Sequence, residues 1–252
     1  MTIYYSILLF IIGSVLGSFY TVLATRLPLK RSIVKPRSHC DNCGKVLKVW
    51  ELIPILSYLI LRGKCSKCHQ HIDPTSTIVE LFLGTTFTLS YLYYGFSIEF
   101  YLLLIILSLI AIIFVSDFKY MIILDSPLIV AVLLIIGLKI YYVGFTETIY
   151  YVCYGLITFA VMYLFKIFGD LIFKKESLGG GDIKLSFLFG LILGWQLGLL
   201  TIAIGAFLAF PIALYVTLKK EKSSEIPFGP YLILGLLVVF FFGEYILKLL
   251  II

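Results

Sequence analysis

Apolar segments of membrane-spanning length follow one another along this chain, and they restrict its fold more than any other feature. Each is close to the roughly 20 residues that a helix needs to cross the hydrocarbon core of a bilayer. Backbone in lipid must satisfy its own hydrogen bonds, so each segment predicts an α-helix. About eight such segments lie at residues 3–23, 77–95, 99–115, 122–143, 148–170, 183–199, 200–218 and 229–250.

Composition agrees with this pattern, because 61% of the 252 residues are hydrophobic and only 13% are charged. A soluble domain of this length has no means of hiding so much apolar surface from water. The sequence therefore predicts an all-α membrane protein with the lipid bilayer as its main partner. The basic residues border the spans instead of lining a soluble face, which argues against a nucleic-acid partner.

The stretch 183–218 holds two spans only if the motif GWQLG at 194–198 forms a tight turn.

Lysine and arginine are distributed unevenly between the two sides that these spans define. Eighteen of the 20 fall in the 24–76 loop or in segments on the same side, and only Lys139 and Lys248 fall on the other. Positively charged loops favour the cytoplasm. We therefore expect a multi-pass protein with a cytoplasmic 24–76 loop and both termini outside.

The first apolar run has no basic leader and no small-residue cleavage site, and it predicts a retained span. The charged stretch 219–225 predicts a short solvated loop.

The 24–76 loop contains two CxxC motifs separated by 21 residues. Two residues between thiolates allow both sulfurs to reach one ion, and two such motifs complete a closed tetrahedral zinc site. Two disulfides or four free thiols are the alternatives, and a reducing cytoplasm disfavours disulfides. The neighbouring histidines at 39, 69 and 71 are interpreted as surroundings of the site, and Gly44 as a source of positive φ. The predicted zinc ligands are Cys40, Cys43, Cys65 and Cys68.

Acidic side chains near the predicted spans are few, and each needs an explanation because a charge in lipid is costly. Asp170 and Glu244 lie near span ends, where they reach water, and Asp125 precedes a Ser-Pro pair that is typical of a helix N-cap. Asp117 ends the third predicted span and Asp182 opens the sixth, on the same side of the membrane. These two carboxylates are able to meet if their helices pack together.

A close pair of carboxylates does not readily ionise twice, so one keeps a proton while the other acts as a base. This arrangement predicts aspartic-protease chemistry, with Asp117 and Asp182 as the catalytic pair. Gly179–Gly181 precede Asp182 and favour close approach of a substrate chain. A flexible loop with an N-capping aspartate is the alternative interpretation of this motif. Lys184 either holds the adjacent charge or extends towards lipid headgroups.

Several motifs, in the same order along the chain, resemble those of the bacterial prepilin peptidases, also called type IV leader peptidases, of the GxGD aspartyl class. In two places the chain departs from the family pattern, with Thr21 at an Asn position and Leu124 at a Pro position. The resembling stretches are Gly17–Pro28, Cys40–Cys43, Glu51–Tyr58, Leu61–Cys68, Val79–Leu81, Asp117–Asp125, Gly179–Leu185 and Pro227–Pro230.

The resemblance implies cleavage of a short basic leader from prepilins or pseudopilins, after a glycine, at the cytoplasmic face of a bacterial plasma membrane. It also implies that many members N-methylate the new amino terminus with S-adenosylmethionine, although this chain has no GxGxxG-type site. A basic leader beside a basic membrane face suggests local relief by lipid or by acids at Asp41, Glu51 and Asp73. The predicted domains are a first span at 1–23, a zinc-binding loop at 24–76 and a seven-helix protease core at 77–252.

Two other function classes remain open at this point. A transporter would use Asp117 and Asp182 as a proton or cation site, and it would show flux without proteolysis. A noncatalytic assembly scaffold would use its zinc loop to bind a partner, and pilin processing would survive replacement of Asp117.

Overall fold

The fold was analysed in a computed structural model that describes residues 1–174, 176–219 and 226–251. These residues form helices and no β-strand, which confirms the predicted all-α class. Six of the 219–225 positions, on which the predicted charged loop falls, lie outside the described residues. The helices are α1 (Thr2–Arg26), η1 (Val49–Leu52), α2 (Leu56–Ile60), α3 (Thr75–Tyr94), α4 (Ile98–Tyr120), α5 (Asp125–Tyr142), α6 (Phe145–Phe173), α7 (Gly180–Leu193), α8 (Trp195–Leu218) and α9 (Gly229–Ile251).

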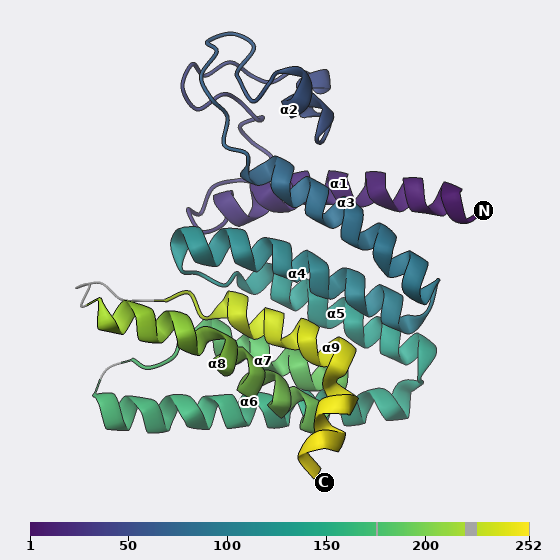
Figure 1. The fold of residues 1–252 in the computed structure, drawn as a ribbon, viewed down its shortest axis with the longest axis vertical. Helices are drawn as coiled ribbons and strands as arrows, with labels where there is room; N and C mark the ends of the chain where they lie inside the picture. The colour runs from purple at the N-terminus through teal and green to yellow at the C-terminus, as the bar shows by residue number, and fades with distance from the viewer. Residues whose placement is uncertain (175, 220–225, 252) are drawn as a thin grey trace. The chain divides into compact units, whose positions relative to one another are not determined.

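Eight of these helices correspond to the eight predicted spans (Figure 1). Six of them, α1, α4, α5, α6, α8 and α9, are long and apolar enough to cross a membrane. The other two differ because α7 has only 14 residues and α3 is rich in Thr and Ser. The tight turn expected between the sixth and seventh spans is present, with Gly194 at φ +87° between α7 and α8.

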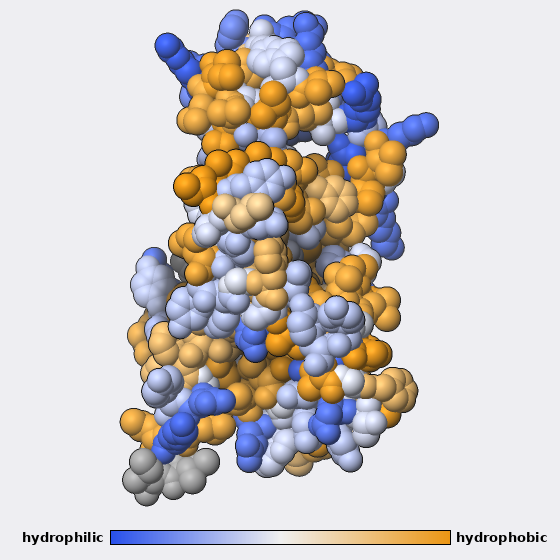
Figure 2. All heavy atoms as spheres, turned by 90° about the vertical axis from the view of Figure 1, so that its right-hand side faces the viewer, coloured by the Kyte–Doolittle hydropathy of each residue, from blue (hydrophilic) through white to orange (hydrophobic). Residues whose placement is uncertain are grey.

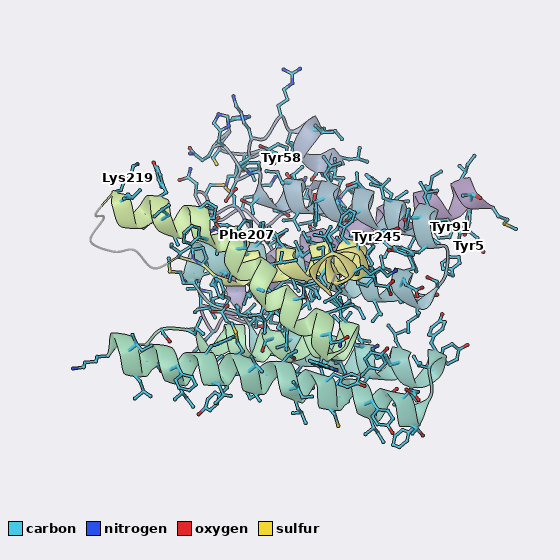
Figure 3. All side chains as sticks on the ribbon, turned by 60° about the horizontal axis from the view of Figure 1, so that its bottom comes forward. Tyr5, Tyr58, Tyr91, Phe207, Lys219 and Tyr245 are labelled. Carbon is cyan, nitrogen blue, oxygen red and sulfur yellow. The ribbon has the colours of Figure 1, made fainter. Side chains whose placement is uncertain are left out.

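The chain folds as two compact units, Met1–Ser116 and Asp117–Ile252. In the first unit, α1 and α3 lie side by side (Figure 1). Glycines bring the backbones of the two helices close together. A Cβ on Gly13 would lie 2.5 Å from the carbonyl oxygen of Leu83, and one on Gly17 would lie 2.8 Å from Cα of Glu80. At the other end of this pair, the rings of Tyr5 and Tyr91 are 5.7 Å apart (Figure 3). Close glycine contacts of this kind are typical of helix pairs in membranes.

In the second unit, α7 packs against α6 and α8, and α8 packs against α9. Gly190 of α7 lies against the backbone of α6, because an added Cβ would come within 2.2 Å of the carbonyl oxygen of Tyr154. Near this contact the buried hydroxyl of Thr158 donates to the carbonyl oxygen of Ser186, at 2.8 Å. These contacts fix the short helix α7 between its longer neighbours.

Alanine at Gly190 is therefore expected to destabilise the protein by about 1–3 kcal/mol, the usual cost of overpacking. Gly137 is the matched control, because it is also inside a helix but an added Cβ there meets nothing within 4 Å. Gly137→Ala should be neutral or slightly stabilising, because alanine favours helix. Thermal unfolding midpoints in detergent test the pair, and equal midpoints would contradict the close α6–α7 packing.

Candidate active site

Asp117 lies in the last turn of α4 and is only 5% exposed. Its Oδ2 accepts a hydrogen bond from the backbone N–H of Gly229, at 3.1 Å. Gly229 is the first residue of α9, and the first N–H groups of a helix have no hydrogen-bond partner within that helix. Pro230 follows it at a position where proline suits an α-helix. The Pro-Phe-Gly-Pro motif thus directs a helix N-terminus at the carboxylate of Asp117, where it favours negative charge.

Asp182 lies in the first turn of α7 and is 7% exposed. The N-cap of α7 is Gly179, so the interpretation of Asp182 as the N-cap residue is wrong. The backbone N–H of Gly179 donates to the Asp182 carboxyl group. The other oxygen, Oδ1, is buried and has no hydrogen-bond partner among the described residues. An unpartnered buried oxygen is costly, which is typical of a group reserved for a ligand.

Asp117 and Asp182 line the same cavity, which has a volume of about 830 Å³. Their carboxyl groups are close enough for their charges to interact. The cavity is therefore a concave site with two convergent acids, as expected for a small active site. Its lining consists of Asp117, Met121, Ile122, Ile123, Glu176, Ser177, Leu178, Gly179, Gly180, Gly181, Asp182, Ile226, Pro227 and Phe228.

Of the glycines before Asp182, Gly181 allows close packing and Gly180 leaves the backbone open to an approaching chain. A Cβ on Gly181 would lie 2.7 Å from Cβ of Ile123, so this position holds the α4–α5 loop against the start of α7. A Cβ on Gly180 would meet nothing within 4 Å, which leaves that side of the backbone open. Gly179 has φ −67°, so the freedom of a left-handed turn is not what this glycine supplies.

Asp125 and Lys184 form an ion pair that the sequence did not predict. Lys184 Nζ lies 2.7 Å from Oδ1 and 2.8 Å from Oδ2 of Asp125. The N-cap of α5 is Leu124, so the interpretation of Asp125 as an N-cap is wrong. The pair links the start of α5, which follows Asp117 in the chain, to the first turns of α7, which contain Asp182. Leu124 has φ −78°, a value that a proline also adopts, so the backbone at this position is compatible with the proline of the family pattern.

Asp170 fixes the segment that leads into α7. Its Oδ1 accepts a hydrogen bond from the backbone N–H of Ser177, at 2.6 Å, and the hydroxyl of Ser177 donates to the carbonyl oxygen of Lys166. Ser177 also lines the cavity. Sequence reasoning treated Asp170 only as an acid that reaches water at a span end. A carboxylate shortly before the glycine motif was the one signal that pointed to this role.

The four predicted zinc ligands converge, and their sulfur atoms all lie within 4.8 Å of one another. Cys40 and Cys68 sulfurs are 3.8 Å apart, and those of Cys43 and Cys65 are 3.9 Å apart. Tetrahedral zinc with Zn–S bonds of about 2.3 Å requires sulfurs about 3.8 Å apart, whereas a disulfide requires about 2.05 Å. The donor set therefore fits zinc, and the disulfide alternative is wrong. No histidine belongs to this cluster among the described residues.

The backbone of the loop is arranged for a metal. Gly44 has φ +65°, as expected, and His69 takes the corresponding position after the second motif at φ +57°. The N–H groups of Cys68 and Lys67 lower the pKa of Cys65 to about 6, which favours its thiolate, whereas burial and the neighbouring thiols raise the pKa of Cys43 to about 11. Beside the cluster, Glu51 is buried and accepts hydrogen bonds from Lys45 and Lys48.

These contacts alter the interpretation of the loop acids. The Lys45 ammonium, the Lys48 N–H and the Ser66 hydroxyl together lower the pKa of Glu51 to about 2. Its charge is thus neutralised inside the loop, and Glu51 is not a free site for a basic peptide. Asp73 accepts hydrogen bonds from the N–H and the hydroxyl of Thr75 at the start of α3. Of the three proposed acids, Asp41 and Asp73 are exposed and only Glu51 is buried.

The fold and the site together define a helical membrane protein with a pair of buried carboxyl groups at one cavity. Two family models match this chain: the bacterial peptidase A24 N-terminal domain over residues 11–94, and the type IV leader peptidase family over residues 102–214. No solved structure matches the chain.

Curated relatives agree with the family models over nearly the full length. A prepilin leader peptidase/N-methyltransferase of Bacillus subtilis is 32% identical over 251 residues, covering 96% of each chain. Enzymes of the same name from Pseudomonas putida and Vibrio cholerae are 30% and 29% identical, covering 96% and 94% of this chain and 92% and 96% of theirs. This chain belongs to the type IV leader peptidase family.

Proposed function

We propose that this protein is a membrane-embedded aspartyl endopeptidase that removes the leader peptide of a type IV prepilin or pseudopilin. One observation carries the proposal: Asp117 and Asp182 line one cavity, and Oδ1 of Asp182 is buried without a hydrogen-bond partner among the described residues. Membership of the leader peptidase family and the names of the relatives identify the class of substrate. The transporter alternative has no support from these comparisons.

The two aspartates take different parts in the reaction because their surroundings differ. Asp117, facing the N-terminus of α9, starts as the carboxylate and removes a proton from water. Asp182 carries a proton on Oδ1 and donates it to the scissile carbonyl oxygen while the water oxygen bonds to the carbonyl carbon. In the tetrahedral intermediate the proton on Asp117 passes to the leaving nitrogen. Asp182 recovers its proton as the carbonyl reforms and the C–N bond breaks, which restores the starting state.

The site belongs at the cytoplasmic face, because the basic residues that favour the cytoplasm lie on its side of the predicted spans. The apolar helix of the prepilin would lie in the bilayer, with the bond after its glycine at the cavity. Zinc held by the four cysteines would stabilise the fold of the loop and takes no part in the cleavage. N-methylation of the new terminus by S-adenosylmethionine is part of the proposal on the strength of the relatives' names, with no residue assigned to it.

Incubation of the purified protein with a prepilin in detergent, followed by mass analysis, tests this function. We expect a product cut after the leader glycine, with an added methyl group only when S-adenosylmethionine is present. A cut without the methyl group would support the peptidase and contradict the methyltransferase. An intact prepilin, together with aspartate-dependent ion flux into vesicles, would favour the transporter instead.

Charge reversal at the Lys184–Asp125 ion pair is expected to lower kcat by roughly 10-fold, because small misplacements of catalytic groups are expensive in rate. Both side chains are exposed, and exposed pairs contribute about 0–1 kcal/mol, so the unfolding midpoint should hardly change. Lys184→Asp and Asp125→Lys should each lose activity, and the double variant should regain much of it. Separate measurement of kcat and KM on a prepilin distinguishes positioning from binding, and full activity in both single variants would contradict the role.

A further inference from the structure

The segment from Val49 to Ile60, which comprises η1 and α2, exposes an unusual number of large apolar side chains. Figure 2 shows hydrophobic side chains gathered on the loop at the top of the view, with hydrophilic side chains around them. Large exposed apolar patches with a polar rim mark interaction surfaces. The exposed side chains, between 41% and 76% accessible, are Val49, Trp50, Leu52, Ile53, Leu56, Leu59 and Ile60.

The position of this segment relative to α1 and α3, the helices of its own unit, indicates what it contacts. The backbone N–H of Ile55, just before α2, donates to Oε2 of Glu80 at 2.8 Å. The Cα of Glu80 in turn packs against Gly17 of α1, a helix long and apolar enough to span a membrane. Gly17 precedes the end of α1 at Arg26 by nine residues, or about 13 Å at the usual helical rise. The loop therefore folds back, and α2 starts level with the body of a spanning helix.

The charges that flank the segment are those expected at a membrane surface. Lys48, Arg62 and Lys64 flank it in the sequence, and all three are exposed. Between residues 48 and 64 the only acid is Glu51, which is buried and paired with Lys45. The exposed surface of the segment thus combines apolar side chains with positive charge. This combination matches the boundary between acyl chains and anionic headgroups.

We propose that the Val49–Ile60 segment lies in the membrane interface, with its apolar side chains among the upper acyl chains and its flanking basic residues on anionic phospholipid headgroups. Trp50 is suited to this position, because tryptophan concentrates at membrane–water interfaces. The zinc-binding loop is then held to the bilayer by this segment as well as by α1. This attachment is separate from the proposed peptidase activity and does not depend on it.

Trp50 is itself the reporter for a test, because the chain has only two tryptophans and Trp195→Phe leaves Trp50 alone. The full-length variant would be reconstituted in vesicles of phosphatidylcholine and phosphatidylglycerol whose acyl chains carry bromine near the headgroup or near the bilayer centre. We expect shallow bromine to quench Trp50 more than deep bromine, and aqueous iodide to quench it little. Quenching by iodide alone would overturn the proposal, and so would protection from both quenchers, since protein would then cover the segment.

A second set of variants separates a specific attachment from mere closeness to lipid. Leu59→Ser combined with Ile60→Ser should reduce shallow-bromine quenching about twofold or more, because each serine removes most of an apolar burial. Val34→Ser is the matched control, because Val34 is 73% exposed in the same loop but outside the segment. Unchanged zinc content would show that the loop still folds. Equal quenching in the double variant and the control would overturn the proposal.

Discussion

Asparagine in place of Asp117 or Asp182 is expected to lower prepilin cleavage by roughly 10³- to 10⁴-fold, the usual contribution of positioned acid–base groups. Asparagine keeps the shape of each side chain but neither accepts a proton from water nor donates one to a carbonyl oxygen with a similar driving force. The two losses should not multiply in the double variant, because both residues serve the same step. Single-turnover cleavage of a prepilin in detergent measures the effect.

Structural damage is a separate explanation that needs its own control. Asp182→Asn exchanges a buried, protonated carboxyl group for a neutral amide of similar shape, so the variant should be about as stable as the parent protein. Glu244→Gln is the matched control, because Glu244 is exposed in α9 and does not line the cavity. It should retain full activity. Persistent cleavage after either aspartate becomes asparagine would end the proposal, and it would favour a noncatalytic scaffold.

Much of the fold was predictable from the sequence because the membrane leaves few choices. Hydropathy identified eight helices, since only helical backbone satisfies itself within an apolar segment. The turn at Gly194 was expected from local chemistry, and it separates α7 from α8 as predicted. The expectation that Asp117 and Asp182 would lie together came from the cost of charge near lipid, and both line one cavity. Their catalytic role, the membrane orientation and the three predicted domains stay predictions.

The supporting contacts of the site were not predictable, because they depend on how distant segments pack. Gly229 offers Asp117 a backbone N–H from 112 residues further along the chain, and no side chain marks that role. Lys184 had two plausible uses in the sequence and takes a third, because its partner Asp125 is 59 residues away. Likewise, Asp170 accepts a hydrogen bond from the backbone N–H of Ser177, seven residues further along the chain, and no local sequence rule marks that contact.

Local sequence rules were also wrong where a tertiary contact competed with them. A Ser-Pro pair after Asp125 is typical of an N-cap, yet the carboxylate pairs with Lys184 of α7 instead. Glu51 looked like a free acid on a basic loop, yet it is buried against Lys45. In both cases the carboxylate pairs with a lysine, which is a stronger partner than water: Lys184 lies 59 residues from Asp125, and Lys45 lies six residues from Glu51.

Loss of the zinc site is expected to unfold the loop between α1 and α3. Structural zinc contributes about 10–16 kcal/mol to the folding of small zinc-dependent peptides, far more than the apolar contacts of so short a loop supply. Cys65→Ser should have the largest effect, because Cys65 is the buried member of the cluster. We expect zinc content to fall from about one ion per chain, the stoichiometry of a closed four-cysteine site, to nearly none. Trypsin should then cut at the loop's many lysines and arginines.

The control for this experiment is Cys153→Ser, because Cys153 is a free, exposed cysteine of α6 outside the cluster. Its zinc content and protease resistance should equal those of the parent protein. Chelation of the parent protein should reproduce the Cys65→Ser pattern, and added zinc should reverse it, since the ligands remain intact. A parent protein that contains no zinc and still resists trypsin in the loop would show that hydrogen bonds such as Lys45–Glu51 hold the loop without a metal.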